Sequence, residues 1–147
     1  MDKEKVIEAL NCDLEHEMAA IIRYLHHSFL VKGPLRGPLS TLFRTKALES
    51  MAHAITLGEK ITVMGGHPSV SIQQVFNCTQ EPTIEGMIKE NLEAEEHHLA
   101  LYEEQLSLVK GNTALRLMIE QFIVEEASHI EELQMYIRHT VREPIEV

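Results

Sequence analysis

The sequence has 147 residues, of which 44% are hydrophobic, so it suits one folded domain with a buried core rather than a disordered chain. Its 23 acidic residues outnumber 13 lysines and arginines, and the net charge of −10 argues against binding nucleic acid or anionic membranes while favouring attraction of cations. No apolar run has the length of a membrane span, the N-terminus is not signal-like, and the two cysteines are isolated. We therefore expect a cytoplasmic protein without a disulfide framework or zinc ribbon.

Four segments repeat apolar residues every three to four positions, the spacing of amphipathic helices. We predict helices over about residues 2–31, 39–64, 83–110 and 113–142. Glycine and proline end them at Gly33-Pro34, Gly37-Pro38, Gly65-Gly66-His67-Pro68 and Gly111-Asn112. The expected inward-facing residues of the first helix are Val6, Leu10, Leu14, Met18, Ile21, Leu25 and Phe29. Those of the second are Leu42, Phe43, Leu48, Met51, Ile55, Leu57, Ile61 and Met64.

The segment 69–82 lacks a period, so we predict a connector of about 15 residues, with room for a helical turn near Ile72–Phe76. Such a connector reaches roughly 50 Å, enough to return along a helix of about 26 residues. The other turns are short and make their helices antiparallel. The prediction is an all-α four-helix bundle, up-down-down-up, with one long crossover between the second and third helices, in a single domain over 1–147. All-antiparallel connectivity is the alternative.

The fourth helix carries a Glu-x-x-His motif on its apolar face. Glu126 and His129 lie three residues apart, so they project from neighbouring points of one helix face. That face also carries Ile119, Phe122, Ile123, Ile130 and Leu133. Burying a carboxylate and an imidazole there costs several kcal/mol unless they are paired or bound to a cation. One such motif also arises by chance on an acidic helix, so the rest of the chain must decide.

Two phrases in the sequence occur twice, which indicates a repeated helix hairpin. The first phrase recurs at an offset of 78 and the second at an offset of 76. The matching stretches are Leu14-Glu15-His16-Glu17 with Tyr24 against Leu92-Glu93-Ala94-Glu95 with Tyr102, and residues 49–54 against 125–130. Two hairpins of this kind would be related by a pseudo-twofold axis.

Packing the predicted helices would bring five polar side chains together near the middle of the bundle: Glu17, His53, Glu95, Glu126 and His129. Carboxylates and neutral imidazoles without thiolates are ligands that Fe(II) accepts. Two metal ions would neutralise buried acids that could not otherwise remain ionised together.

On these motifs the chain resembles the ferritin-like di-iron carboxylate superfamily, and is most similar to bacterioferritin, over about residues 10–137. That family places one Glu on the first helix, Glu-x-x-His on the second, one Glu on the third and Glu-x-x-His on the fourth. Carried over residue by residue, the resemblance implies iron ligands at Glu17, His53, Glu95, Glu126 and His129. Tyr24 matches the tyrosine that lies beside the di-iron centre in such proteins.

The sequence departs from this pattern at position 50, where Ser50 replaces the expected second-helix glutamate. Glu49 lies four residues before His53 and would supply the carboxylate if the helix were locally overwound or bulged; otherwise it is a solvated acid. His98, three residues after Glu95, would add an imidazole ligand; otherwise it is a surface or supporting histidine. The departure leaves open an asymmetric or mononuclear site.

Met51 matches the methionine with which bacterioferritins bind haem across a subunit twofold axis. Packing in the core is the alternative interpretation for a helical methionine near an apolar face. The sequence thus leaves haem as a less favoured cofactor beside iron.

The resemblance implies a ferroxidase that binds two iron ions, oxidises Fe(II) with O₂ or peroxide, and works as a homo-oligomer, at least a dimer. A peroxide-reducing di-iron enzyme similar to rubrerythrin is one alternative, and His98 as a further ligand would support it. A helical scaffold that has lost its metals is the other, and Ser50 would be its first sign.

Overall fold

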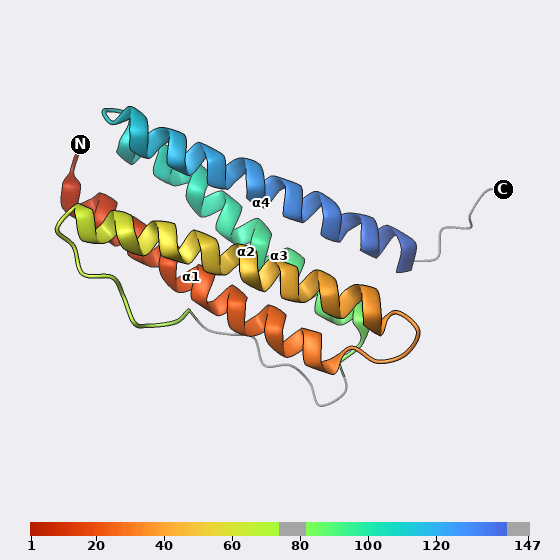
Figure 1. Cartoon of the computed structure of the whole chain (residues 1–147). Coiled ribbons are helices and arrows are strands. Elements are labelled where there is room, and N and C mark those ends of the chain that lie inside the picture. The colour runs from red at the N-terminus through yellow and green to blue at the C-terminus, as the bar shows by residue number, and fades with distance from the viewer. Residues whose placement is uncertain (74–81, 141–147) are drawn as a thin grey trace.

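The computed structural model describes residues 1–73 and 82–140, with side chains as far as residue 137, and consists of long helices packed as a bundle (Figure 1). The helices are α1 (Lys3–Leu30), α2 (Arg36–Val63), α3 (Ile84–Gln105) and α4 (Thr113–Thr140), with a 3₁₀ turn, η1 (Leu106–Val109), after α3. No strand occurs within the described residues. The predicted all-α four-helix bundle is confirmed.

The order of the helices is up-down-down-up. In Figure 1, α1 and α4 run in one direction along the bundle, and α2 and α3 run in the other. The end of α2 and the start of α3 therefore lie at opposite ends of the bundle, as the predicted long crossover requires (Figure 1). The helical turn expected near Ile72–Phe76 lies mostly outside the described residues; residues 72 and 73 are not helical. None of the described helices has the length and apolarity to cross a bilayer.

Short polar residues and glycines fix the ends of the helices. Asp2 caps α1 by accepting a hydrogen bond from the Lys5 N–H, and Thr83 caps α3 by accepting from the Gly86 N–H. Gly33 follows α1 with a φ of 86°, a conformation that glycine adopts without strain. A Cβ on Gly66 would lie 2.7 Å from Ile7 Cγ2, so the end of α2 packs closely on α1 because this residue has no side chain.

The second helix begins three residues earlier than expected. Gly37 and Pro38 were predicted to precede the helix, but α2 starts at Arg36 and includes both. Proline is tolerated in the first turn of a helix because the N–H groups there have no intrahelical acceptor.

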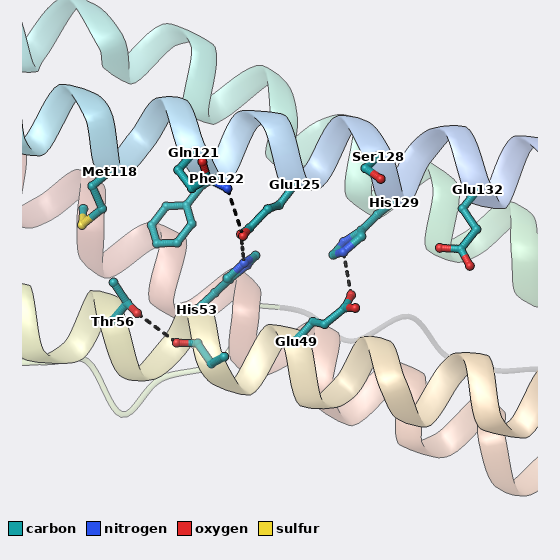
Figure 2. A pocket seen from close by; sticks show the side chains of 11 residues that line it. Glu49, His53, Thr56, Met118, Gln121, Phe122, Glu125, Ser128, His129 and Glu132 are labelled. Carbon is teal, nitrogen blue, oxygen red and sulfur yellow. Dashed lines mark hydrogen bonds and ion pairs between the residues drawn. The ribbon is translucent and has the colours of Figure 1, made fainter.

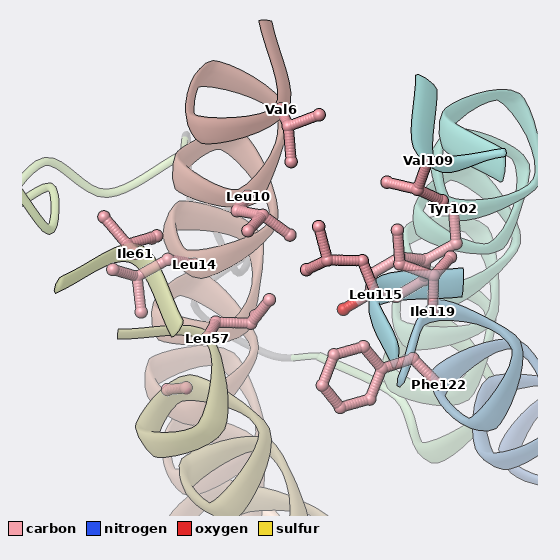
Figure 3. Close-up of a cluster of buried hydrophobic side chains, with 11 residues drawn as sticks. Val6, Leu10, Leu14, Leu57, Ile61, Tyr102, Val109, Leu115, Ile119 and Phe122 are labelled. Atoms are coloured by element: carbon pink, nitrogen blue, oxygen red, sulfur yellow. The ribbon is translucent and has the colours of Figure 1, made fainter. Parts of the chain in front are cut away.

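Two apolar clusters fill the bundle, one toward each end. The first, shown in Figure 3, comprises Val6, Leu10, Leu14, Ala54, Leu57, Ile61, Tyr102, Val109, Leu115, Ile119 and Phe122. The second comprises Ala20, Tyr24, Val31, Leu39, Phe43, Ala47, Met87, Ile88 and Leu133. Every helix contributes to both. Each helix also buries polar residues between the two clusters, namely Glu17, Ser50, His53, Glu95, His98 and Glu126. The middle of the bundle is therefore the place where charged groups are buried.

The predicted inward faces of α1 and α2 are partly wrong. The apolar residues expected inside but found on the surface are Met18, Leu25, Phe29, Leu48, Met51 and Ile55, and Ile22 joins them. The positions facing the interior instead carry Glu17, Arg23, His27, Lys46 and Ser50. The spacing of apolar residues predicted the wrong buried face for these two helices, because their buried faces are polar around the centre of the bundle.

Candidate metal centre

Five of the residues predicted as metal ligands come together between the two apolar clusters, one or two from each helix. Glu17 of α1, Glu95 of α3 and Glu126 of α4 are 1%, 4% and 2% exposed. His53 of α2 is also buried, and its imidazole ring lies 6.5 Å from that of His129 of α4, centroid to centroid. Three carboxylates and two imidazoles thus share one interior site.

These side chains form two groups that overlap in one residue. Glu17, His53 and Glu126 each offer a ligand atom within 4.8 Å of the others, and so do Glu95, Glu126 and His129. We call them the His53 triad and the His129 triad. Because Glu126 belongs to both triads, its carboxylate would be a ligand shared by two cations.

The acids of this site cannot all be ionised in the absence of a cation. Burial and the neighbouring charge of Glu95 raise the pKa of Glu126 well above its ordinary value. Burial opposes ionisation of Glu95 as well, but the hydrogen bond from protonated Glu126, the guanidinium of Arg23 and the Tyr24 hydroxyl lower its pKa to about 2. Glu126 Oε2 is buried without a hydrogen-bond partner in the described part of the chain. A buried carboxylate oxygen that accepts no hydrogen bond can bind a cation instead, so these residues fit a metal.

Two tyrosines hold the carboxylates in a reciprocal pattern that follows the sequence repeat. Tyr24 donates a hydrogen bond to Glu95 Oε1 at 2.7 Å, and Tyr102 donates to Glu17 Oε1 at 3.2 Å. Each tyrosine of one hairpin therefore supports the carboxylate of the other. Tyr24, predicted to lie beside the metal centre, is fully buried and contacts one of its acids; a catalytic role for it stays a prediction.

A pocket of about 620 Å³ opens between α2 and α4 and reaches both histidines (Figure 2). Its acidic residues are Glu49, Glu125 and Glu132. His53 Nε2 pairs with Glu125, whereas His53 Nδ1 lies 3.2 Å from Glu17 Oε1. Burial lowers the pKa of His53, but Glu17 and Glu125 outweigh burial and raise it. One ring nitrogen thus faces the buried site, and the other is held by a carboxylate of the pocket.

Glu49 makes the equivalent contact in the other half of the repeat. Its Oε2 lies 2.6 Å from His129 Nε2. Figure 2 marks this ion pair with a dashed line. α2 is α-helical throughout Arg36–Val63, without the bulge that would turn Glu49 inward. The buried position belongs to Ser50, and Glu49 stands outside both triads. The sequence did not single out Glu125, although its offset of 76 from Glu49 is a signal that could have found it.

We expect Glu49→Ala to weaken metal binding at the His129 triad by about tenfold, because a carboxylate on the outer nitrogen of a ligating histidine fixes its orientation and basicity. Calorimetric titration of the metal-free protein with Co(II) measures the effect. Glu59→Ala is the matched control, since Glu59 is an exposed acid of the same helix. Unchanged affinity in Glu49→Ala would remove Glu49 from the site.

His98 lies in the interior, so its interpretation as a surface histidine is wrong. Its Nε2 is 3.3 Å from Asp13 Oδ1, its Nδ1 is 3.7 Å from Glu17 Oε1, and its ring stacks on Tyr102. It therefore touches one acid of the His53 triad without belonging to either triad. Asp13, which the sequence analysis missed, is fully buried, and burial raises its pKa although His98 and Gln105 partly offset this. Its position one turn before Glu17 is the only signal in the sequence.

Met51 lies on the outer side of α2 and is 46% exposed. It is therefore not part of the core of its own chain, which was the alternative to haem binding. Haem binding by Met51 stays a prediction.

The ferritin-like domain family matches residues 7–142. The chain belongs to this family. Two relatives are bacterioferritins: that of Desulfovibrio desulfuricans is 25% identical over 130 residues, covering 87% of this chain and 72% of the relative, and that of Rhodobacter capsulatus is 27% identical over 135 residues, covering 90% and 83%.

Solved structures of the ferritin-like family share the fold. A ferritin-like, diiron-carboxylate protein from Bacillus anthracis has a TM-score of 0.88 at 29% identity, covering 93% of this chain and 98% of the other. The bacterioferritin of Desulfovibrio desulfuricans, described by its diiron site in different catalytic states, has a TM-score of 0.83 at 24% identity over 93% of this chain and 80% of the other. The predicted family and its four-helix architecture are thus confirmed.

Proposed function

We propose that this ferritin-like protein binds Fe(II) at the two triads and oxidises it to Fe(III), for iron storage or detoxification. The observation that carries the proposal is the pair of overlapping triads, which share the buried Glu126. The bacterioferritin relatives support it at the level of the family.

The chemistry uses Fe(II) as substrate. Each ion gives up one electron, and two electrons with two protons convert O₂ to hydrogen peroxide, or convert peroxide to water. The protein would hold two ions, with Glu126 as the ligand common to both and with His53 and His129 as ligands of one ion each. The pocket between α2 and α4 offers a route from solvent, and its three acids would attract Fe(II).

The test is addition of two equivalents of Fe(II) to the metal-free protein without oxygen, followed by O₂ or by peroxide, with Fe(III) measured by absorbance. We expect Fe(III) to form at least about tenfold faster than in buffer. His129→Ala should lose binding of at least one ion, and with it the fast phase. A rate equal to that of buffer in the unmodified protein would favour the metal-free scaffold.

One observation favours the rubrerythrin-like alternative, namely the buried His98 beside Glu17. It predicts faster turnover with peroxide than with O₂ when a reductant is supplied. Comparing the two oxidants in the same assay separates the two enzymes.

We further propose that the protein forms at least a dimer through the outer face of α1 and α2. These two helices expose the apolar residues Met18, Ile22, Leu25, Phe29, Leu48, Met51 and Ile55. An apolar surface of this kind is typical of an interface, and an R. capsulatus relative of 22% identity is described with haem iron at a crystallographic special position. Haem at Met51 would require such a dimer. The native mass of the protein measures the number of subunits in the assembly. The cytoplasmic location stays a prediction.

A further inference from the structure

The two halves of the repeat differ at the positions that control charge. The offset of 76 relates Glu126 to Ser50 and Phe122 to Lys46. Phe122 lies against His53, with 4.8 Å between ring centroids. At the equivalent position of the other half, one turn before Ser50, the chain carries a cationic side chain instead of an aromatic one.

Lys46 is buried beside the His129 triad. Its side chain is 2% exposed, and its Nζ donates a hydrogen bond to Glu132 Oε2 at 2.9 Å. Glu132 lies one turn beyond His129 on α4 and is half-exposed. The ammonium also lowers the pKa of Glu126, against the larger effects of burial and of Glu95 that raise it. Lysine is rarely buried unless its charge is paired, as Lys46 is here with Glu132. Its positive charge also acts on Glu126, so it contributes to the electrostatics of the site.

The other charged residues reinforce the difference. Two further acids lie next to the His53 triad. Glu125 pairs with His53 directly, and Asp13 pairs with His98, which in turn contacts Glu17. The His129 triad is adjoined by Glu49, but also by two cations. These are Lys46 and Arg23, whose guanidinium lowers the pKa of Glu95. At the offset of 78, Arg23 corresponds to Leu101 and Asp13 corresponds to Asn91. The other half of the repeat therefore has neither the cation nor the acid at these positions.

We propose that Lys46, together with Ser50, makes the two halves of the centre unequal. The His53 triad binds a divalent metal ion tightly, while the Lys46 ammonium supplies part of the positive charge that the His129 triad needs, and so keeps metal binding there weak and reversible. This inference rests on the proposed metal binding. Its consequence is one ion that stays in place and one that exchanges during turnover.

The experiment is a titration of the metal-free full-length protein with Co(II), followed by calorimetry and by the visible absorbance of the bound ion. We expect two binding steps that differ at least about tenfold in dissociation constant. His53→Ala should remove the tighter step and His129→Ala the weaker one.

Lys46→Gln should tighten the weaker step by about tenfold and leave the tighter step nearly unchanged, because it removes one buried positive charge from the His129 side. Lys46→Met, which keeps the side-chain volume, should have the same effect. It controls for any effect of the glutamine amide group in Lys46→Gln. Lys89→Gln is the matched control, since Lys89 is an exposed lysine that pairs with Glu85.

Two equal binding steps in the unmodified protein would overturn the proposal, and so would an equal effect of Lys46→Gln on both steps or no effect on either. Unequal Co(II) steps without Fe(II) oxidation would contradict the proposed ferroxidase function and leave this inference standing. Rapid Fe(II) oxidation with two equal Co(II) binding steps would support the ferroxidase function and contradict this inference.

Discussion

Glu126→Gln is expected to abolish binding of both metal ions and to slow Fe(II) oxidation by at least about a hundredfold. The reason is that Glu126 alone belongs to both triads, so its loss removes a ligand from each ion at once. An amide oxygen is a far weaker ligand for Fe(II) than a carboxylate because it carries no charge. Metal analysis after incubation with Fe(II) under anaerobic conditions and desalting measures the first effect, and stopped-flow absorbance the second.

The substitution should leave the fold intact. Burial and the charge of Glu95 raise the pKa of Glu126 and so favour its protonated form in the metal-free protein, and glutamine has nearly the shape and charge of that form. Thermal unfolding of the metal-free variant should therefore match that of the metal-free parent. Glu125→Gln is the control, since Glu125 holds His53 from the pocket side and its loss should weaken binding by only about tenfold. Retention of one tightly bound ion in Glu126→Gln would show that the triads do not share this ligand.

The bundle and the meeting of five candidate metal ligands could be predicted because both depend on spacing. Helix period, turn residues and the length of the connector determine the topology, and the two offsets of the repeat bring Glu17, His53, Glu95, Glu126 and His129 to one level. The exchanged contacts of the tyrosines with the carboxylates were not predicted, but they follow the same pseudo-twofold relation.

The inward faces of α1 and α2 could not be predicted in the same way. The rule that apolar residues face the core fails where polar groups are buried around the candidate metal centre, and where apolar residues such as Phe29 and Met51 lie on an outer face. Asp13 and Lys46 were missed for the same reason, since each is one charged residue in an acidic, helical sequence and only its partners identify it. The position of Glu49 depends on the rotation of α2 by a fraction of a turn, which spacing does not resolve.

Removing the metal is expected to lower the thermal unfolding temperature by about 10 °C or more. An ion present at a hundred times its dissociation constant stabilises the folded state by about 2.7 kcal/mol, and two ions by about twice that. For a domain of this size each kcal/mol shifts the midpoint by about 2–4 °C. Differential scanning calorimetry with and without Co(II), after treatment with a chelator, measures the difference.

The difference should also grow as the pH rises above about 4.5. Burial raises the pKa of Glu126 in the metal-free protein, so the folded state holds a proton that the unfolded state has released, and stability falls as the pH rises toward the raised pKa. A bound cation takes the place of that proton, so the metal-loaded protein escapes this loss. Glu126→Gln serves as the control, because it should show neither the gain from Co(II) nor the part of the pH dependence that comes from this carboxyl group. A midpoint that is the same with and without metal at every pH would mean that the buried acids are accommodated by the protein alone, and the metal centre would lose its physical basis.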